Sequence, residues 1–487
     1  MIILSGYDNR NIIYDAGDYI LRKIEKNYFH EIEKIYNIYE MFSLEKNGIV
    51  KTEIIKSENC FKHKKHVITY PYEWAANMYK DAVLFHLSLI TALDPYGLTL
   101  KDSLPNNILF DCCTPVFVDF ASLVRTEKLC EEKWLIEGNH LLDPRFVVVE
   151  KMFIPFMLIP FVAMLKKKHS LARRILAEQA CNCDASAPAW KNIGLDSLFK
   201  IATVSPLRNI LDLFVNIFSE EDKLIAKILL LIGRKKIHFI DFIRELSQMI
   251  IEANIAPRQS AYLSYYENKK EKFDFEDDSF WNNKQKNVHE ILSTFKPSTV
   301  LDIGANTGWF SILAAKIGAN VIATDIDESC INSLYLFAKR ERLRLLPLVL
   351  SFDELTREIY GVENDDPCYA GRDFKATPLF LPATRRLKVE LVLCLGLIHH
   401  LVLGMGKKIG DVMEVLSELS DKQVILEFVS IEDELIMEEP SFFKCIDRYT
   451  VDNYNINLAI GEAKKIFRIV KILNSGTDTR KLLFLEK

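Results

Sequence analysis

Hydrophobic and polar positions divide the chain into two parts with different periodicities. From about residue 281 onward, short apolar runs alternate with amphipathic stretches, which predicts βαβ units on a parallel sheet. From Tyr72 to about Ile250 the pattern is mostly helical, with strand-like runs between Ile108 and Leu123. We therefore expect an α/β C-terminal domain preceded by a mostly helical α+β domain.

The N-terminal and linking segments complete this division. Residues 1 to about 70 contain strand-like runs and one helix, predicted from Asn27 to Phe42 because apolar residues recur there at helical spacing. The polar and aromatic segment 251–280 has no dominant periodicity and is expected to be a connector. The expected domains are residues 1–250, with a small lobe of about 1–70 and a helical part of about 71–250, then the connector 251–280, then residues 281–487.

Composition and charge exclude several classes of protein. The chain has 487 residues, so two or more domains are expected, and its 49% hydrophobic and 26% charged residues exclude wholesale disorder. Lys and Arg total 62 against 67 Asp and Glu, for a net charge of −5. A general nucleic-acid binder carries a basic excess, so no nucleic-acid partner is expected.

Targeting and cysteine patterns predict a cytoplasmic protein. The start, Met1–Asp8, has no basic region before its apolar residues, so no signal peptide is expected. The most apolar run, Met152–Leu165, is shorter than the ~20 residues of a spanning helix, which predicts a buried segment or an interfacial contact and no transmembrane helix. The 10 cysteines include a lone Cys181-x-Cys183 pair, too few close ligands for structural zinc, so we expect reduced cysteines and no structural zinc site.

A strand, a glycine turn and a helix follow one another in the C-terminal part. The apolar run Thr299–Ile303 is typical of a buried strand, the turn Gly304–Gly308 follows it, and residues 309–316 have a helical face. A second strand, Asn320–Thr324, then delivers Asp325. Glycines let a ligand approach the backbone, and an acidic residue about 20 positions on can bind ribose hydroxyls. The spacing differs from the G-x-G-x-x-G of dinucleotide sites and fits S-adenosylmethionine (SAM), which carries a methionyl zwitterion, a ribose and no phosphate.

Each residue of this pattern has an expected role. Asp302 shapes the turn and reaches the methionyl ammonium, Gly304 and Gly308 admit the ligand, and Asp325 takes both ribose hydroxyls. The alternative is a generic α/β turn in which Asp325 caps a helix. The other expected cofactor contacts are Asn306, Ile326, Ser351, Asp353 and Leu395.

The region of about 260–487 resembles class I SAM-dependent methyltransferases. The resemblance implies a doubly wound, seven-stranded, Rossmann-like sheet. The elements that carry it are a helix from Ser329, strands Leu345–Leu350, Val389–Gly396 and Gln423–Val429, a helix from Gly406 to Leu419, and a hairpin of Ile466–Leu473 and Lys481–Glu486.

A narrower resemblance rests on Ile398-His399-His400-Leu401 and on Leu426-Glu427-Phe428-Val429 with Asp433. These residues are similar to a bacterial group of nodulation-protein-like methyltransferases with a long N-terminal extension. In that group the third strand ends in an acidic residue that contacts the adenine amine. Here Ser351 holds that position and Asp353 follows, so Asp353 or a backbone N–H is expected to replace it.

Three side chains are candidates for catalysis. SAM is a strong methyl donor, so the enzyme must align a nucleophile and remove a proton from it. His399 and His400 leave the fourth strand beside the methyl group, and we expect His400 to be the base, with pocket shaping by both as the alternative. Glu427 is expected to be a second base, a substrate hydrogen-bond acceptor or a structural carboxylate. The aromatic residues Tyr262, Tyr265, Tyr266 and Trp281 either cover the ligand or pack within the connector.

The N-terminal half resembles the protein-kinase-like and aminoglycoside-phosphotransferase-like fold in the spacing of Asp102, Asn107 and Asp119. The resemblance implies that Asp102 orients an acceptor hydroxyl and that the other two hold magnesium with ATP. It also suggests that Arg22 or Lys23 forms an ion pair with Glu31. No glycine-rich loop occurs in residues 1–60, and Asp119-Phe120 is followed by alanine, so the domain either binds ATP or persists as a scaffold.

The expected function is SAM-dependent methyl transfer to an O or N nucleophile of an unidentified acceptor. A small molecule or saccharide is favoured, a lipid or protein remains open, and the kinase-like domain would serve as a scaffold or recognise the acceptor. The alternatives are a bifunctional methyltransferase and ATP/Mg-dependent kinase, a protein-modifying methyltransferase, and a non-catalytic binding module. The sequence does not determine the oligomeric state.

Overall fold

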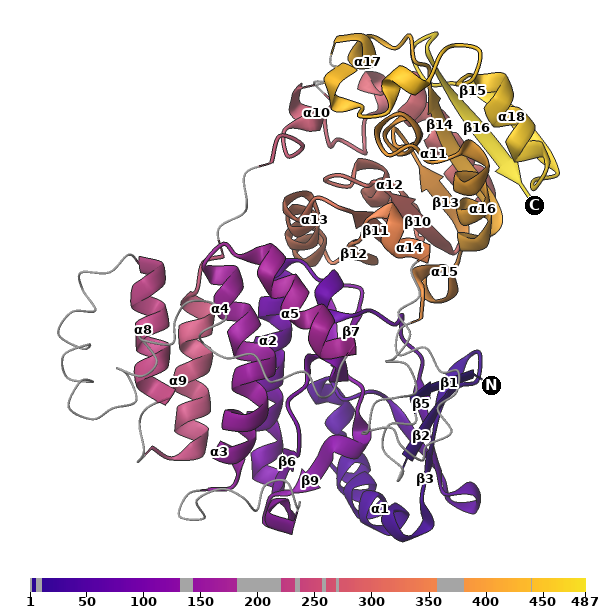
Figure 1. Cartoon of the computed structure of the whole chain (residues 1–487). Coiled ribbons are helices and arrows are strands. Elements are labelled where there is room, and N and C mark those ends of the chain that lie inside the picture. The colour runs from indigo at the N-terminus through magenta and orange to yellow at the C-terminus, as the bar shows by residue number, and fades with distance from the viewer. Residues whose placement is uncertain are drawn as a thin grey trace, which may run out of the picture. The chain divides into compact units, whose positions relative to one another are not determined.

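The structure is a computed structural model that describes residues 2–5, 11–131, 143–181, 220–232, 237–255, 260–268, 271–356, 381–438 and 440–487. The chain divides into two compact units, Met1–Ala256 with Ile359–Phe380, and Pro257–Glu358 with Leu381–Lys487 (Figure 1). The division lies inside the segment 251–280 that was expected to be a connector. Cys183 of the Cys-x-Cys pair lies outside the described residues.

The first unit begins with a five-stranded antiparallel sheet in the order β1-β2-β3-β5-β4. Its one long helix, α1 (Lys26–Met41), connects β3 to β4 and confirms the helix predicted at Asn27–Phe42 to within one residue. The strands are β1 (Ile2–Ser5), β2 (Asn11–Asp15), β3 (Tyr19–Ile24), β4 (Thr52–Ile55) and β5 (Cys60–Lys64).

Aromatic packing holds α1 against this sheet. The ring centroids of Phe29 in α1 and Phe61 in β5 lie 5.4 Å apart, and Phe120 lies 5.7 Å from Phe61 and 5.2 Å from Tyr39. All four residues are buried. Aromatic rings bury large apolar areas, so this cluster fixes the helix on the sheet and brings the segment around Phe120 to it.

Helices form most of the rest of the first unit. One of them, Arg145–Leu165, spans 21 residues and is long and apolar enough to cross a membrane, although 67% of its most apolar window is buried inside the protein. The burial predicted for Met152–Leu165 is confirmed; the helix that contains this run begins earlier, at Arg145, and its π-helical part includes Pro155. The other long helices are α2 (Ala76–Leu93), α5 (His169–Cys181), α8 (Glu220–Ile232) and α9 (Phe239–Glu252), and the long helix itself comprises α3 (Arg145–Val148), the π-helical Val149–Leu158 and α4 (Ile159–Leu165).

Two short antiparallel pairs include the strand-like runs that were predicted between Ile108 and Leu123. One pair is β6 (Leu98–Leu100) with β9 (Leu123–Arg125), and the other is β7 (Ile108–Asp111) with β8 (Thr114–Phe117). The loops that join these strands carry Asp102, Asn107 and Asp119.

The second unit contains a seven-stranded sheet in the order β12-β11-β10-β13-β14-β16-β15. The first five strands of this order are parallel and β16 is antiparallel to both of its neighbours. The strands are β10 (Thr299–Ile303), β11 (Asn320–Asp325), β12 (Leu345–Val349), β13 (Val389–Cys394), β14 (Ser420–Val429), β15 (Ile469–Asn474) and β16 (Arg480–Glu486).

The order of these strands reverses between β10 and β13. From β10 the chain proceeds outward through β11 to β12, and from β13 it proceeds in the opposite direction to β14. Right-handed crossovers in opposite directions place helices on opposite faces of a sheet, which is the doubly wound arrangement. The carboxyl ends of β10 and β13 meet at the switch point, where open α/β sheets bind ligands.

The helices of the second unit begin close to the predicted positions. Helix α13 starts at Glu328, next to the predicted Ser329, whereas α16 starts at Ile409 instead of Gly406, which has a left-handed φ of 72°. The helices are α10 (Tyr265–Asn268), α11 (Asn283–Phe295), α12 (Trp309–Ile317), α13 (Glu328–Glu341), α14 (Phe352–Thr356), α15 (Ala383–Arg386), α16 (Ile409–Leu419), α17 (Glu434–Glu438) and α18 (Ile456–Lys464).

Candidate functional site

The turn after β10 has a backbone that favours glycine. Gly304, Asn306 and Gly308 have positive φ angles of 73°, 54° and 87°. Glycine adopts this conformation without the steric cost of a Cβ, and asparagine is among the residues that tolerate it. The N–H groups of Gly304 and Ala305 donate to the carbonyl of Thr324 at 2.8 and 3.0 Å, so the turn is held against the end of β11.

Asp325 joins this turn to the end of β11. Its Oδ2 accepts from the backbone N–H of Asn306 at 2.8 Å, and its Oδ1 accepts from the backbone N–H of Asp327 at 2.8 Å. Burial raises the pKa of Asp325 in spite of these bonds. Within the described part of the chain it forms no ion pair, so its carboxylate keeps lone pairs for further donors.

The two glycines are required for different reasons. A Cβ at Gly308 would lie 2.4 Å from Cδ1 of Leu334 in α13, so this glycine allows two helices to pack closely. A Cβ at Gly304 would lie 3.4 Å from the side chain of Leu397, which is ordinary contact. The expected role of admitting a ligand therefore fits Gly304, while the packing of the chain itself already explains Gly308.

Asp302 lies inside β10 with 2% of its surface exposed. Its carboxylate accepts from the hydroxyl of Ser311 in α12 at 2.6 Å. Burial raises the pKa of Asp302 to about 6, and the Ser311 bond and the cation of Lys284 oppose this rise.

The aromatic segment before α11 is attached to the glycine turn. The side-chain amide of Asn306 donates to the carbonyl of Tyr262 at 3.1 Å, and the hydroxyl of Ser260 donates to Asp327. Tyr266 is buried, and Asp302 and Asp325 contribute to the rise of its pKa after burial itself. Trp281 is also buried, with its ring centroid 5.2 Å from that of Trp309. These aromatic side chains therefore pack within the unit, and Tyr266 does so near the two carboxylates.

The residues expected to contact adenine have other partners in the structure. Ser351 is the residue before α14, and both its N–H and its hydroxyl donate to Oε2 of Glu354, at 2.7 and 2.8 Å. Asp353 forms an ion pair with Lys407. Ile326, next to Asp325, is 69% exposed, whereas Leu395 at the end of β13 is buried. Ile326 is thus the accessible apolar surface at this corner.

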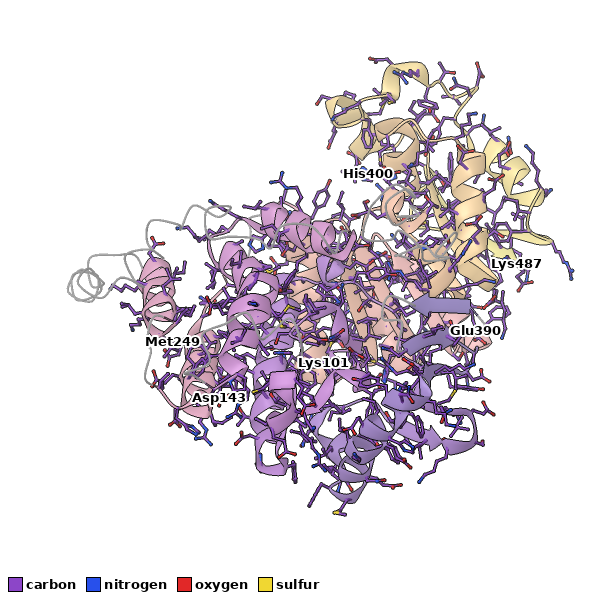
Figure 2. The ribbon with its side chains drawn as sticks, turned by 60° about the horizontal axis from the view of Figure 1, so that its bottom comes forward. Lys101, Asp143, Met249, Glu390, His400 and Lys487 are labelled. Atoms are coloured by element: carbon purple, nitrogen blue, oxygen red, sulfur yellow. The ribbon has the colours of Figure 1, made fainter. Side chains whose placement is uncertain are left out.

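His399 and His400 follow β13 in a short helical turn, and Figure 2 labels His400 in the second unit. Their ring centroids lie 4.2 Å apart, and Phe443 packs against both rings. Burial lowers the pKa of each histidine, and His400, Arg480 and Lys284 lower that of His399 further. His399 is 8% exposed and its Nδ1 has no hydrogen-bond partner in the described structure. Both rings are therefore neutral near pH 7.

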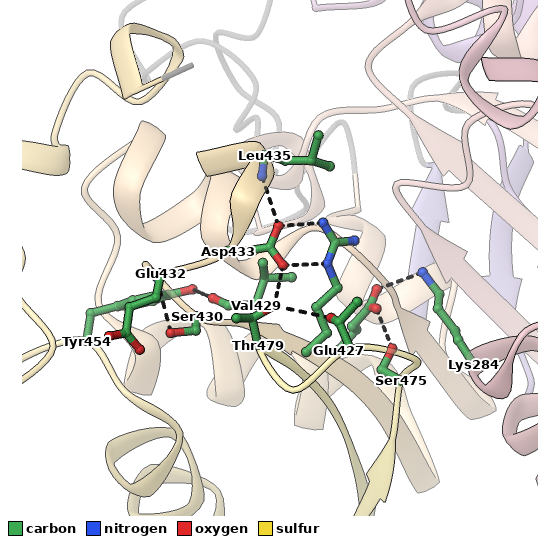
Figure 3. Close-up of polar contacts among 12 residues, drawn as sticks. Lys284, Glu427, Val429, Ser430, Glu432, Asp433, Leu435, Tyr454, Ser475 and Thr479 are labelled. Atoms are coloured by element: carbon green, nitrogen blue, oxygen red, sulfur yellow. Dashed lines mark hydrogen bonds and ion pairs between the residues drawn. The ribbon is translucent and has the colours of Figure 1, made fainter. Parts of the chain in front are cut away.

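Glu427 in β14 is fully buried and paired (Figure 3). Its Oε2 accepts from Nζ of Lys284 in α11 at 2.7 Å, and its Oε1 accepts from the hydroxyl of Ser475 at 2.5 Å. Burial alone would raise the pKa of Glu427, but Lys284 and Ser475 outweigh it and lower the pKa. A carboxylate held in this way is a weak base, which favours the structural or hydrogen-bonding role expected for it.

A second buried pair lies beside the first. Nη2 and Nε of Arg480 in β16 donate to the two oxygens of Asp433 at 2.7 and 2.8 Å, and Thr479 donates to Asp433 at 2.7 Å (Figure 3). Burial would raise the pKa of Asp433, but these donors lower it to about 2. The pair fastens the segment after β14 to the closing hairpin.

Sequence reasoning missed Lys284 and Arg480. Lys284 precedes Val288, Ile291 and Leu292 at helical spacing, and those three residues are buried. The sequence did offer one signal that Lys284 is buried, because this lysine lies on the same helix face as the three apolar residues. Its partner Glu427 is 143 residues away, which no local pattern reveals.

The N-terminal candidates form a second cluster, within the first unit. Oδ1 of Asp102 accepts from Nδ2 of Asn107 at 2.7 Å and from the hydroxyl of Ser122 at 2.8 Å. Asp119 forms an ion pair with the buried Arg22 at 2.9 Å. Burial and the charge of Asp119 raise the pKa of Asp102 to about 7. The structure thus brings Asp102, Asn107 and Asp119 onto neighbouring loops.

This cluster does not fit a magnesium ion as it stands. Magnesium requires oxygen ligands in near-ideal octahedral geometry, yet Asp119 is paired with a guanidinium and Asp102 takes up a proton near neutral pH. No group of three or more His, Cys, Asp or Glu side chains that could hold a metal ion occurs among the described residues. The suggested ion pair with Glu31 is wrong, because Glu31 is half-exposed and pairs with Lys34 at 2.8 Å.

Comparisons with known proteins confirm one expected resemblance. No family model matches the chain. Nodulation protein NoeA of Rhizobium meliloti (strain 1021) is 23% identical over 385 residues, which cover 76% of this chain and 70% of the relative. The resemblance to nodulation proteins is thereby confirmed.

Among solved structures, the bifunctional kinase-methyltransferase WbdD matches with a TM-score of 0.31 and 18% identity over 46% of this chain and 42% of that chain. The magnesium protoporphyrin IX methyltransferase (ChlM) of Synechocystis PCC 6803 with bound SAH matches with a TM-score of 0.29 and 12% identity over 46% of this chain and 95% of that chain. The match therefore spans less than half the length of WbdD.

Proposed function

We propose that residues 260–487 form a SAM-dependent methyltransferase domain of class I. The observation that carries the proposal is the hydrogen bond from the Asn306 backbone to the Asp325 carboxylate, which unites the glycine turn with an acidic strand end at the switch point. The seven-stranded order with one antiparallel strand supports the same assignment, since it agrees with the sheet that the sequence resemblance implies.

The residues of this site fit the parts of SAM. Asp302 would bind the methionyl ammonium, the backbone at Gly304 and Asn306 would lie along the ligand, and Asp325 would accept from the ribose hydroxyls. Ile326 offers an exposed apolar surface for the adenine, and Gly308, Ser351, Asp353 and Leu395 would support the walls of the site. When bound, SAM supplies a methyl group on a sulfonium.

The protein would align the acceptor with the methyl group of SAM and remove a proton from the acceptor. A hydroxyl or amine nucleophile loses a proton on methylation, and a neutral imidazole can accept it. His400 is the base in this proposal, and the buried His399 shapes the turn by packing against His400 and Phe443. Glu427 orients Lys284 and accepts hydrogen bonds, since its lowered pKa disfavours proton uptake.

The first unit serves as a scaffold or acceptor-recognition domain with a kinase-like fold. A five-stranded antiparallel sheet with one helix between its third and fourth strands, followed by the loops of Asp102, Asn107 and Asp119, supports this fold. The Arg22–Asp119 pair favours a scaffold over an active ATP/Mg-dependent kinase.

The test measures binding first and transfer second. Calorimetric titration of the full chain with SAM should give saturable binding, and methyl label from SAM should appear in one fraction of a cell extract whose labelled species is then identified. Absence of SAM binding would overturn the proposal. A thermal shift with Mg-ATP that disappears in Asp119→Asn would establish the bifunctional alternative instead.

A further inference from the structure

Lys284 is a largely buried cation that its described partners satisfy only in part. Its side chain is 16% exposed, and Nζ donates to Oε2 of Glu427 at 2.7 Å. Nζ also lies 5.1 Å from the ring centroid of Phe310, and Tyr265 and Glu271 are near enough to help raise the pKa of Lys284. An ammonium carries three N–H donors, and Glu427 is its one acceptor among the described residues. Two donors are therefore left for another acceptor, and leaving them without one would be costly.

Contacts with consecutive residues of α12 place Lys284 near Asp302. Phe310 packs under the ammonium, and the next residue, Ser311, donates to the carboxylate of Asp302 at 2.6 Å. The cation is close enough to oppose the rise in the pKa of Asp302. A buried carboxylate and a buried ammonium thus lie near each other without a direct bond between them.

The end of β13 also helps to locate the Lys284 ammonium. A Cβ at Gly396 would lie 3.5 Å from Oε2 of Glu427, the same oxygen that holds Lys284. The Lys284 ammonium therefore lies near the carboxyl end of β13. Asp302 lies in β10, the strand that pairs with β13, so the two charged groups are on neighbouring strands of the sheet. Ser475 fixes the other oxygen of Glu427, so the position of the ammonium is preset.

We propose that Lys284 and Asp302 together bind an α-amino acid zwitterion, with Asp302 accepting from its ammonium and Lys284 donating to its carboxylate. The inference rests on the proposed function, in which this zwitterion is the methionyl end of SAM. Charge-assisted hydrogen bonds of this kind are about twice as strong as neutral ones, and the two opposite charges fix the direction of the ligand. Lys284 is accordingly a cofactor-binding residue.

The test compares a ligand with and without its carboxylate, and a protein with and without the Lys284 ammonium. Calorimetry measures binding of S-adenosylhomocysteine and of its decarboxylated analogue to the wild-type chain, to Lys284→Met and to Lys284→Arg. We expect the wild type to bind the analogue about 10- to 100-fold more weakly. Lys284→Met should bind both ligands with the weaker affinity, and Lys284→Arg should retain part of the discrimination.

Controls separate folding and position from binding. Lys286→Met changes an exposed lysine two residues along the same helix and should bind like the wild type. If Lys284→Met unfolds because Glu427 loses its partner, the double variant Lys284→Met/Glu427→Gln removes both buried charges and answers the same question.

The outcomes distinguish this inference from the proposed function. If the wild type binds neither ligand, the methyltransferase proposal fails. If the wild type binds both ligands equally, or if Lys284→Met still discriminates between them, the zwitterion site is overturned. A variant that keeps cofactor affinity and loses only acceptor affinity would also overturn it, because Lys284 would then face the acceptor.

Discussion

Oδ2 of Asp325 accepts a hydrogen bond of 2.8 Å from the backbone N–H of Asn306, and this bond connects the glycine turn to the neighbouring strand. The carboxylate therefore has two functions in the proposed site, since it shapes the turn and offers lone pairs to a ribose. A carboxylate without a cationic partner in the described structure is well suited to donors from a ligand.

Replacement of Asp325 should weaken cofactor binding. Asp325→Ala removes charge-assisted hydrogen bonds, so SAM affinity should fall by roughly 1–3 kcal/mol in calorimetry. The control Asp411→Asn changes an exposed carboxylate in α16 and should bind normally. Unchanged affinity in Asp325→Ala would place the ribose elsewhere.

Gly308 should tolerate no side chain because of one neighbour. In Gly308→Ala the new Cβ would meet Leu334 at 2.4 Å in a backbone with φ of 87°, so urea unfolding should show a loss of about 1–3 kcal/mol. Gly304→Ala should cost less stability, because its Cβ makes ordinary contact at 3.4 Å. In Gly308→Ala/Leu334→Ala the two effects should not add, because the second change removes the clash; strict additivity would show that Leu334 does not cause it.

His400 should act as a base over a wide range of pH. Removal of a general base costs about 10²- to 10⁴-fold in rate, so His400→Ala should slow methyl transfer on that scale and leave SAM affinity unchanged. Because burial lowers the pKa of His400, the wild-type rate should stay level through pH 6.5 and fall only at more acidic pH. From sequence alone the fall is expected near 6.5, the ordinary value of histidine. A normal rate in His400→Ala with a lost rate in Glu427→Gln would make the carboxylate the base.

His399 should make the second unit sensitive to acid. Its folded pKa is lowered, so between that value and about 6.5 the unfolded chain binds more protons, and stability falls as pH falls through this window. His399→Gln lacks this titration. Thermal unfolding from pH 7.5 to 5 should therefore show a smaller loss of stability for His399→Gln than for the wild type, and equal losses would exclude a buried neutral imidazole.

Asp102 should have the opposite dependence in the first unit. Its folded pKa of about 7 exceeds the ordinary value near 3.9, so between these values the folded chain binds more protons and stability falls as pH rises toward 7. Asp102→Asn cannot ionise, so relative to the wild type it should gain roughly 1–3 kcal/mol of stability between pH 5 and pH 8. Denaturant unfolding at the two pH values measures this gain. A constant difference between the variants would show that Asp102 is ionised throughout.

Local patterns of apolar and polar residues were sufficient to predict the strands of the second sheet and the residues near their ends. The apolar runs and the family resemblance together predicted the strands of the second sheet, including the closing hairpin, to within three residues at either end. Side chains at the ends of the strands could be predicted to lie near a ligand, because parallel strands bring their carboxyl ends to one edge of the sheet. Asp325, the last residue of β11, was found in this way, whereas Asp302 and Glu427 lie inside β10 and β14.

The pairing of charged side chains could not be predicted from the chain and became visible in the fold. Lys284 pairs with Glu427 and Arg22 pairs with Asp119, although the partners are far apart in the chain. These contacts changed the expected chemistry, since Lys284 lowers the basicity of Glu427 and Arg22 occupies a carboxylate expected to hold magnesium. Burial likewise set the pKa values of Asp102, His399 and His400. Desolvation and ion pairing depend on which residues the fold brings together. The periodicity of the sequence does not predict these long-range contacts.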